Sequence, residues 1–114
     1  IHINSVDNAP NANGTEVYYA DSNNGNAYGT TSEKLATNIL NRMLYYMGST
    51  NRGVKTAEHA VTKRCEMPAA LTEVGFITNP TEVYNMTTDE YQYKAAQGIA
   101  EGIMITLKDI NVPQ

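Results

Sequence analysis

The chain of 114 residues is long enough for one domain with a hydrophobic core and too short for two. Its formal net charge is −4, and its eight Lys and Arg residues are scattered along the chain, which argues against a nucleic-acid-binding surface. The single cysteine, Cys65, excludes an internal disulfide, and no Cys/His spacing offers a thiolate metal site. No run is apolar enough to cross a bilayer, so we expect no membrane insertion.

Two short strands are expected in the first part of the chain. Residues 1–4 alternate apolar and polar side chains, and residues 15–19 are rich in β-branched and aromatic side chains. Loops rich in Asn follow both strands, over residues 5–14 and 20–29. Loops of this length are usually functional or mobile.

An amphipathic helix is expected next. Large apolar side chains recur at every fourth position: Leu35, Ile39, Met43 and Met47. Residues 30–33 have the sequence of a capping box, and Gly48 follows the last apolar position. These signals predict a helix that begins near residue 31 and stops at Gly48.

For the middle of the chain the sequence predicts less regular structure. A second long helix is expected after this part. Residues 51–55 indicate a turn and a short extended piece, and residues 60–63 suggest a further short strand. Residues 87–90 open the last helix, whose apolar positions form one stripe: Tyr91, Ala95, Ile99, Ile103 and Leu107. Gly98 and Gly102 lie near this stripe, which predicts close packing on a sheet.

The stretch Met67 to Pro80, MPAALTEVGFITNP, carries the strongest functional signal. Its nearly unbroken apolar run is typical of a strand covered on both faces, and Glu73 interrupts that run. A buried ionised carboxylate costs several kcal/mol unless a cation, a metal or hydrogen-bond donors compensate it. We place Glu73 near the carboxyl end of the strand, where ligands bind in open α/β sheets. A satisfied structural carboxylate is the alternative interpretation.

A short helix is expected directly after this strand. Asn79 is suited to the N-cap, and Pro80 is suited to the first helical position. Glu82 is placed to close a capping box. Strands that alternate with helical patterns predict an α/β fold, a mixed and mostly parallel sheet with helices on both faces. The sheet would be small and incomplete at its N-terminus. Because the chain starts at Ile1 without an initiator methionine or signal peptide, we expect a mature or excised segment.

Four blocks of the sequence together resemble one protein family. They are IHIN at residues 1–4, NGTEVYY at 13–19, NRGVK at 51–55 and the Met67 to Pro80 stretch. In this order and spacing they resemble the zinc-dependent N-acetylmuramoyl-L-alanine amidases, the type-3 catalytic domain of bacterial autolysins and phage endolysins. The resemblance implies hydrolysis of the amide that joins N-acetylmuramic acid to the L-alanine of the peptidoglycan stem peptide. It also implies Zn2+ as the cofactor.

The resemblance assigns roles to individual residues. His2 matches the last metal-binding histidine of the family, and Glu73 matches its catalytic glutamate, the general base and acid. Asn4 and Asn13 are candidate substrate contacts at the rim of the site. A catalytic zinc keeps about three protein ligands, and the family takes the other two from a segment that precedes the part matched here. We therefore expect residues 1–114 to be a single amidase-like catalytic domain that lacks its N-terminal part and is inactive alone.

Two other functions stay open on these residues. One is a non-catalytic wall-binding or regulatory remnant of an amidase, and the other is a different zinc peptidase on a similar sheet. For the amidase, peptidoglycan, the muramoyl-peptide polymer, is the expected partner, whereas the peptidase would take a peptide in place of the muramoyl amide. We expect a monomer. The resemblance places the protein outside the cell at the bacterial wall, as a secreted autolysin or a phage-encoded lysin.

Overall fold

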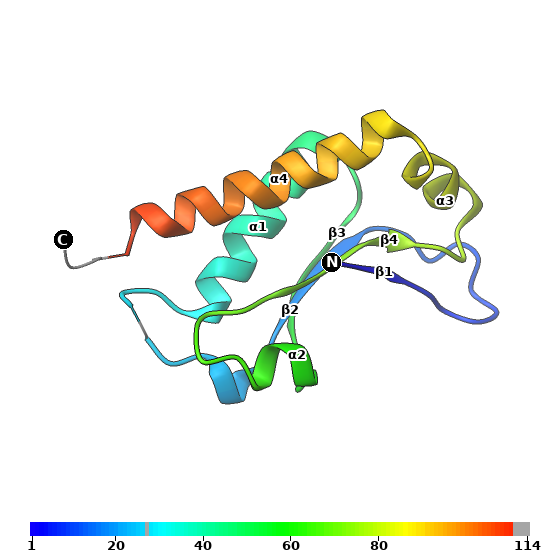
Figure 1. Ribbon diagram of the computed structural model, residues 1–114. Helices are drawn as coiled ribbons and strands as arrows, with labels where there is room; N and C mark the ends of the chain where they lie inside the picture. Colours follow the sequence, from blue (N-terminus) through cyan, green and yellow to red (C-terminus); the bar gives the residue numbers. More distant parts are fainter. Residues whose placement is uncertain (27, 111–114) are drawn as a thin grey trace.

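Four strands form one mixed sheet in the computed structural model, which describes residues 1–26 and 28–110 (Figure 1). The strands are β1 (His2–Asn4), β2 (Thr15–Tyr19), β3 (Asn51–Thr56) and β4 (Leu71–Phe76), and their order across the sheet is β1-β4-β2-β3. β1 runs parallel to β4 and β2 parallel to β3, whereas β2 and β4 are antiparallel. The mixed, mostly parallel sheet predicted from the sequence is confirmed.

β4 lies inside this sheet, between β1 and β2, and all six of its residues are buried. The strand predicted from the apolar run is therefore confirmed. Glu73 is the third of the six residues, so its predicted place near the carboxyl end of the strand is wrong. The reason is that pairing with β1 continues past Gly75 to Phe76, through an irregular step in the register.

Two long helices, α1 (Ser32–Met47) and α4 (Asp89–Lys108), lie on the same side of the sheet (Figure 1). α1 packs on β2, β3 and β4, and α4 runs along α1. α1 ends at Gly48, which adopts the left-handed conformation with φ 66°, as predicted. The helix start is shifted by one residue from the predicted capping box, because the Thr31 hydroxyl accepts the hydrogen bond from the Lys34 amide.

The contact between the long helices depends on two glycines of α4. A Cβ added to Gly98 would lie 2.6 Å from the Met43 Cα atom, and one added to Gly102 would lie 2.4 Å from the Ile39 Cα atom. The backbones of α1 and α4 are thus in direct contact. The predicted close packing exists, but its partner is a helix and not the sheet.

Two short helices flank β4. Residues Ala60–Lys63 form α2, so the short strand predicted there is wrong. The amides of Thr62 and Lys63 both donate to the His59 carbonyl, and this segment therefore satisfies its backbone within its own turn and needs no sheet partner. α3 (Pro80–Met86) begins as predicted, with Asn79 as the cap and Pro80 in the first turn.

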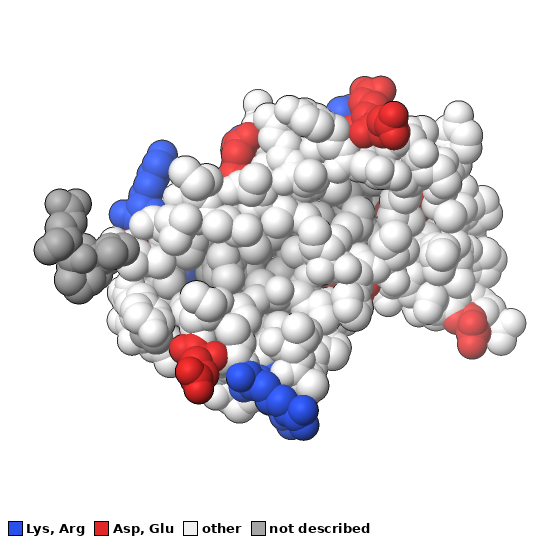
Figure 2. Space-filling model, viewed as in Figure 1, with Lys and Arg blue, Asp and Glu red and all other residues white. Residues whose placement is uncertain are grey.

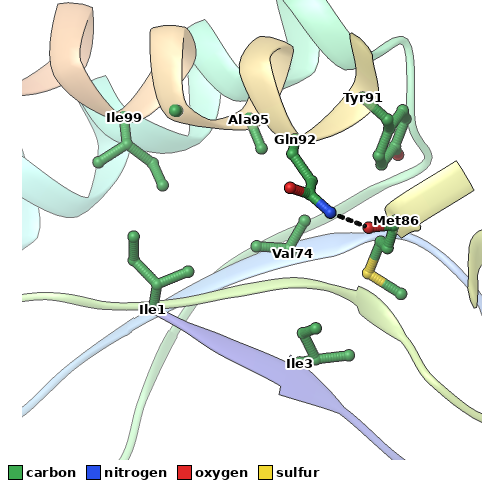
Figure 3. A pocket seen from close by; sticks show the side chains of 9 residues that line it. Ile1, Ile3, Val74, Met86, Tyr91, Gln92, Ala95 and Ile99 are labelled. Atoms are coloured by element: carbon green, nitrogen blue, oxygen red, sulfur yellow. Dashed lines mark hydrogen bonds between the residues drawn. The ribbon is translucent and has the colours of Figure 1, made fainter. Parts of the chain in front are cut away.

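The apolar stripe of α4 is only partly covered. Ala95 is buried and belongs to the core, whereas Ile103 and Leu107 are exposed. Figure 3 shows Ile1 and Ile3 pointing from the β1 side toward α4, where they line a cavity of about 240 Å³ together with Val74 and Ile99. Ile1 is 81% exposed. In this view charged side chains are few and lie mostly at the margin of the molecule (Figure 2). The residues that line the cavity between α4 and β1 are mostly apolar.

Neither of the long helices is suited to cross a membrane. In the described ranges α1, α4 and the shorter helices all lack the combination of length and apolar content that a bilayer span requires.

Candidate functional site

The sheet brings His2 and Glu73 together although 70 residues separate them in the chain. They are directly paired across the parallel strands β1 and β4, and the His2 Nδ1 atom lies 3.8 Å from the Glu73 Oε1 atom. Because successive side chains alternate between faces, Ile1 and Ile3 point toward α4 while His2 points to the opposite face. The alternating pattern at the start of the chain thus places apolar side chains against α4 and His2 on the other face of the sheet.

Glu73 is buried with little compensation. Its side chain is 12% exposed, and its Oε2 atom is buried without a hydrogen-bond partner within residues 1–26 and 28–110. Burial raises the pKa of Glu73 above its ordinary value, against the opposing effect of His2. The charge of Glu16 raises the pKa of Glu73 further, and His59 lowers it. A carboxylate in this state can take up a proton more readily than one in water.

Glu16 is the second carboxylate of this face and is paired with Glu73 across β2 and β4. It is 2% exposed, and both of its oxygens accept hydrogen bonds. Its Oε1 atom accepts from Asn4 Nδ2 at 2.7 Å and from the Tyr18 hydroxyl at 3.0 Å. Its Oε2 atom accepts from Arg52 Nε at 3.3 Å and from Lys55 Nζ.

The surroundings of Glu16 determine its charge. Burial alone would raise the pKa of Glu16, but the hydrogen bonds from Lys55, Tyr18 and Arg52 outweigh it and hold that pKa below the ordinary value. Glu16 is therefore an ionised structural carboxylate whose oxygens are already occupied. It is not free to bind a metal.

The two asparagines predicted as substrate contacts differ in position. Asn4 lies beside the site, where its amide donates to Glu16 and its Oδ1 atom accepts from the Ser5 amide. Asn13 orders a loop instead, because its amide donates to the Asn11 carbonyl and its Oδ1 atom accepts from the Thr50 hydroxyl at 2.7 Å. Substrate contact stays a prediction for both.

Glu82 has a role that its sequence context did not indicate. Its buried carboxylate accepts hydrogen bonds from the Gly14 amide at 3.0 and 3.1 Å and from the Phe76 amide at 3.0 Å. The predicted capping box is therefore wrong, because the carboxylate turns away from its own helix. Gly75 makes room for it, since a Cβ at Gly75 would lie 3.0 Å from the Glu82 Oε2 atom. The sequence signal that could have indicated this contact was Gly75, which lies shortly before α3.

His59 also lies closer to the site than its sequence position suggested. Its ring packs edge-on against Tyr18, with 5.2 Å between the ring centroids. Its Nδ1 atom is buried and has no hydrogen-bond partner among the described residues. Together with its effect on the pKa of Glu73, this places a second imidazole on the same side of the sheet.

The donor atoms of the site suit zinc in kind. The His2 ring is 59% exposed and accessible, and its Nδ1 atom lies 3.8 Å from the Glu73 Oε1 atom. Nitrogen and oxygen donors are both accepted by zinc. Within the part of the chain that the structure describes, no group of three or more His, Cys, Asp or Glu residues is arranged to hold a metal. His2 can thus be one ligand of a site that needs others.

Comparisons with known proteins identify the family. The sequence model of a family described as N-acetylmuramoyl-L-alanine amidase matches residues 1–104. N-acetylmuramoyl-L-alanine amidase LytC of Bacillus subtilis is 36% identical over 102 residues, which are 90% of this chain and 20% of LytC. The endolysin of Bacillus phage SPP1 is 35% identical over 104 residues, 90% of this chain and 37% of the endolysin.

Solved structures show the same fold. The N-acetylmuramoyl-L-alanine amidase AmiC2 of Nostoc punctiforme superposes with a TM-score of 0.81 at 36% sequence identity. The match covers 93% of this chain and 54% of the AmiC2 chain. The chain therefore spans about half of that structure, and less than half of LytC and of the endolysin.

Proposed function

The chain belongs to the N-acetylmuramoyl-L-alanine amidase family, and from this membership we propose that its parent protein hydrolyses peptidoglycan. The bond cleaved is the amide between N-acetylmuramic acid and the L-alanine of the stem peptide. One observation carries the proposal: the pairing of His2 with Glu73, which sets an accessible imidazole beside a buried carboxylate with an unpartnered oxygen. A polymeric substrate can reach this site because it lies on the face opposite the long helices.

In the proposed mechanism His2 is one zinc ligand and Glu73 is the general base and acid. Bound zinc supplies Lewis acidity toward water and toward the scissile carbonyl. Glu73 accepts a proton from the attacking water as the new carbon–oxygen bond forms. It then delivers that proton to the leaving nitrogen as the carbon–nitrogen bond breaks. The Glu73 oxygen that has no hydrogen-bond partner among the described residues is open for that proton.

We propose that the remaining zinc ligands come from the parent protein outside these 114 residues, and that residues 1–114 are one part of a larger catalytic domain. The exposed side chains of Ile1 and Ile3 beside α4 support this, because neighbouring exposed apolar side chains are often a contact with further polypeptide. The chain spans 54% of the AmiC2 structure, which leaves room for such a segment. On its own the chain would then be inactive.

Substrate and location follow from the same membership. Peptidoglycan is the partner, and the protein acts at the bacterial wall, as a secreted autolysin or as a phage lysin. The names of the relatives, an amidase and a phage endolysin, include both kinds. We propose a monomer.

The test measures zinc content and muropeptide release for the 114-residue chain and for the parent protein side by side. We expect only the longer form to bind about one zinc ion and to release stem peptides with a free L-alanine amine. Metal binding by neither form would remove the catalytic proposal and favour a wall-binding remnant. Cleavage of peptide bonds with no free L-alanine amine would instead indicate a zinc peptidase.

A further inference from the structure

Two cations of β3, Arg52 and Lys55, lie on the same face of the sheet as Glu73. Lys55 is paired with Tyr18, two positions along β2 from Glu16, and Glu16 is paired with Glu73. Because side chains alternate along strands, these paired positions project to one side. Arg52 reaches the same side past the irregular register of β3, and there its Nε atom contacts Glu16. The cations therefore belong to the surface that the proposed substrate would contact.

The two cations supply more positive charge than the carboxylate between them needs. Arg52 and Lys55 both contact the Glu16 Oε2 atom, and Glu16 is 2% exposed. One cation would balance one carboxylate. Arg52, Lys55 and Glu16 together carry a formal charge of about +1, and Glu73 is the further carboxylate on this face.

The side chains of Arg52 and Lys55 are held in place and are accessible to solvent. The Arg52 guanidinium lies over the Phe76 ring, with its Cζ atom 4.8 Å from the ring centre, and its Nε atom donates a hydrogen bond to Glu16. These two contacts fix its orientation. Its only other hydrogen bond in the described residues is from Nη1 to the Asn13 carbonyl, at 3.5 Å. The side chains of Arg52 and Lys55 are 33% and 38% exposed. Unused donors of both groups can thus reach a ligand.

The spacing of the strands places these donors at a defined distance from the proposed chemistry. β3 is separated from β4 by β2, which amounts to about 10 Å for two strand spacings. An extended peptide advances about 3.3–3.6 Å per residue, so about two to three residues cover this distance. Guanidinium and ammonium donors bind carboxylates and phosphates through charge-assisted hydrogen bonds, and of these two groups a peptide offers the carboxylate.

We propose that Arg52 and Lys55 bind a carboxylate of the stem peptide, located two to three residues from the scissile amide. This inference rests on the proposed amidase function and deepens it. The site would then distinguish stem peptides that carry a free carboxylate there from those that carry a carboxamide. Arg52 and Lys55 are specificity residues in this account and take no part in bond cleavage.

The test is a binding measurement on the parent protein with the Glu73→Gln substitution, which blocks turnover. Calorimetry compares two soluble muramoyl-peptides that differ only by carboxylate or carboxamide at that position. We expect about tenfold or tighter binding of the carboxylate, weakening with added salt. Arg52→Gln and Lys55→Gln should each reduce this preference, whereas Lys108→Gln, at the far end of α4, should preserve it.

The outcomes separate the two proposals. Equal affinity of the Glu73→Gln protein for the two peptides would overturn the inference. This comparison keeps Arg52 and Lys55 intact, so its result does not depend on whether a β3 variant folds. A preference that survives both substitutions in folded protein would also overturn it. If the unsubstituted parent cleaves neither peptide, the amidase proposal fails, while the affinity ratio still decides whether the cations recognise a carboxylate.

Discussion

Glu16 and Glu73 occupy directly paired positions on β2 and β4, so two carboxylates lie side by side within one sheet. Only Glu16 is compensated, by a set of four donors: Asn4, Tyr18, Arg52 and Lys55. Glu73 has the His2 ring at 3.8 Å and an oxygen that is buried and unpartnered within the described ranges. The same residue type therefore serves the fold at one position and is free for chemistry at the other.

Glu73→Gln in the parent protein should abolish most turnover and preserve the fold. The amide has nearly the same shape but cannot take up the proton of water, and loss of a general base lowers the rate by about 10²–10⁴-fold. Thermal unfolding should show equal or higher stability, because an uncompensated buried charge is removed. Muropeptide release and the unfolding temperature are the two measurements.

The matched control is Glu66→Gln, at an exposed position. It should leave both turnover and stability unchanged. Near-normal turnover in Glu73→Gln would exclude Glu73 from the mechanism.

Glu16→Ala should destabilise the fold strongly. It removes a buried carboxylate that accepts hydrogen bonds from four donors, and a hydrogen bond to a charged group contributes about 1.5–3 kcal/mol. Urea unfolding measures this loss of free energy. A loss below about 1 kcal/mol, the range of a surface ion pair, would show that the Glu16 cluster is not structural.

Stability should fall at acid pH because of the same residue. The folded-state pKa of Glu16 lies below its unfolded value, so its contribution is present above the unfolded pKa, about 4.3, and is lost as pH falls through the folded pKa. Glu16→Gln cannot titrate and should therefore show a shallower decline of stability below about pH 4. Urea unfolding at a series of pH values compares the two proteins, and parallel curves would contradict the assignment.

Gly102→Ala should destabilise the protein although alanine is the better helix former. The added Cβ would lie 2.4 Å from the Ile39 Cα atom, and such overpacking costs about 1–3 kcal/mol. Ala100→Gly, at an exposed position of the same helix, is the comparison and should lose only the helix propensity of about 1 kcal/mol. A stabilising Gly102→Ala would mean that α1 and α4 are further apart than described.

Glu82→Gln should weaken the link between β4 and the first loop. The carboxylate accepts from the Gly14 and Phe76 amides with both oxygens, whereas the amide of Gln has one acceptor and no charge. The expected loss is about 1–3 kcal/mol in urea unfolding. Glu90→Gln, in an exposed pair with Lys94, should change stability by less than about 1 kcal/mol. Equal effects of the two substitutions would contradict the buried role of Glu82.

Much of the fold was predictable because its signals are local. The apolar run around Glu73 predicted β4, and Gly48 and Asn79 marked a helix end and a helix start correctly. The pattern of residues 60–63 was misleading because a four-residue segment can close its bonds within one turn as easily as in a sheet. A segment of four residues is too short for its periodicity to distinguish a helical turn from a strand.

The contacts between distant segments were not predictable in the same way. The glycines of α4 indicated a close neighbour but not which one, since a helix backbone and a sheet demand the same absence of a side chain. Glu82 fitted a local capping motif, yet its partner Gly14 lies 68 residues away. Likewise, the proximity of His2 to Glu73 depends on strand order, which their own sequence blocks do not specify.

The glycine contact between α1 and α4 also determines how the molecule can accept a partner. The two backbones touch at Gly98 and Gly102, so there is no room for a side chain between them, and Ile99 and Ile103 line a cavity together with Ile1. A segment that docks there meets side chains already placed by this packing. Association would therefore lose little conformational entropy on this side, and the arriving segment alone would need to fold.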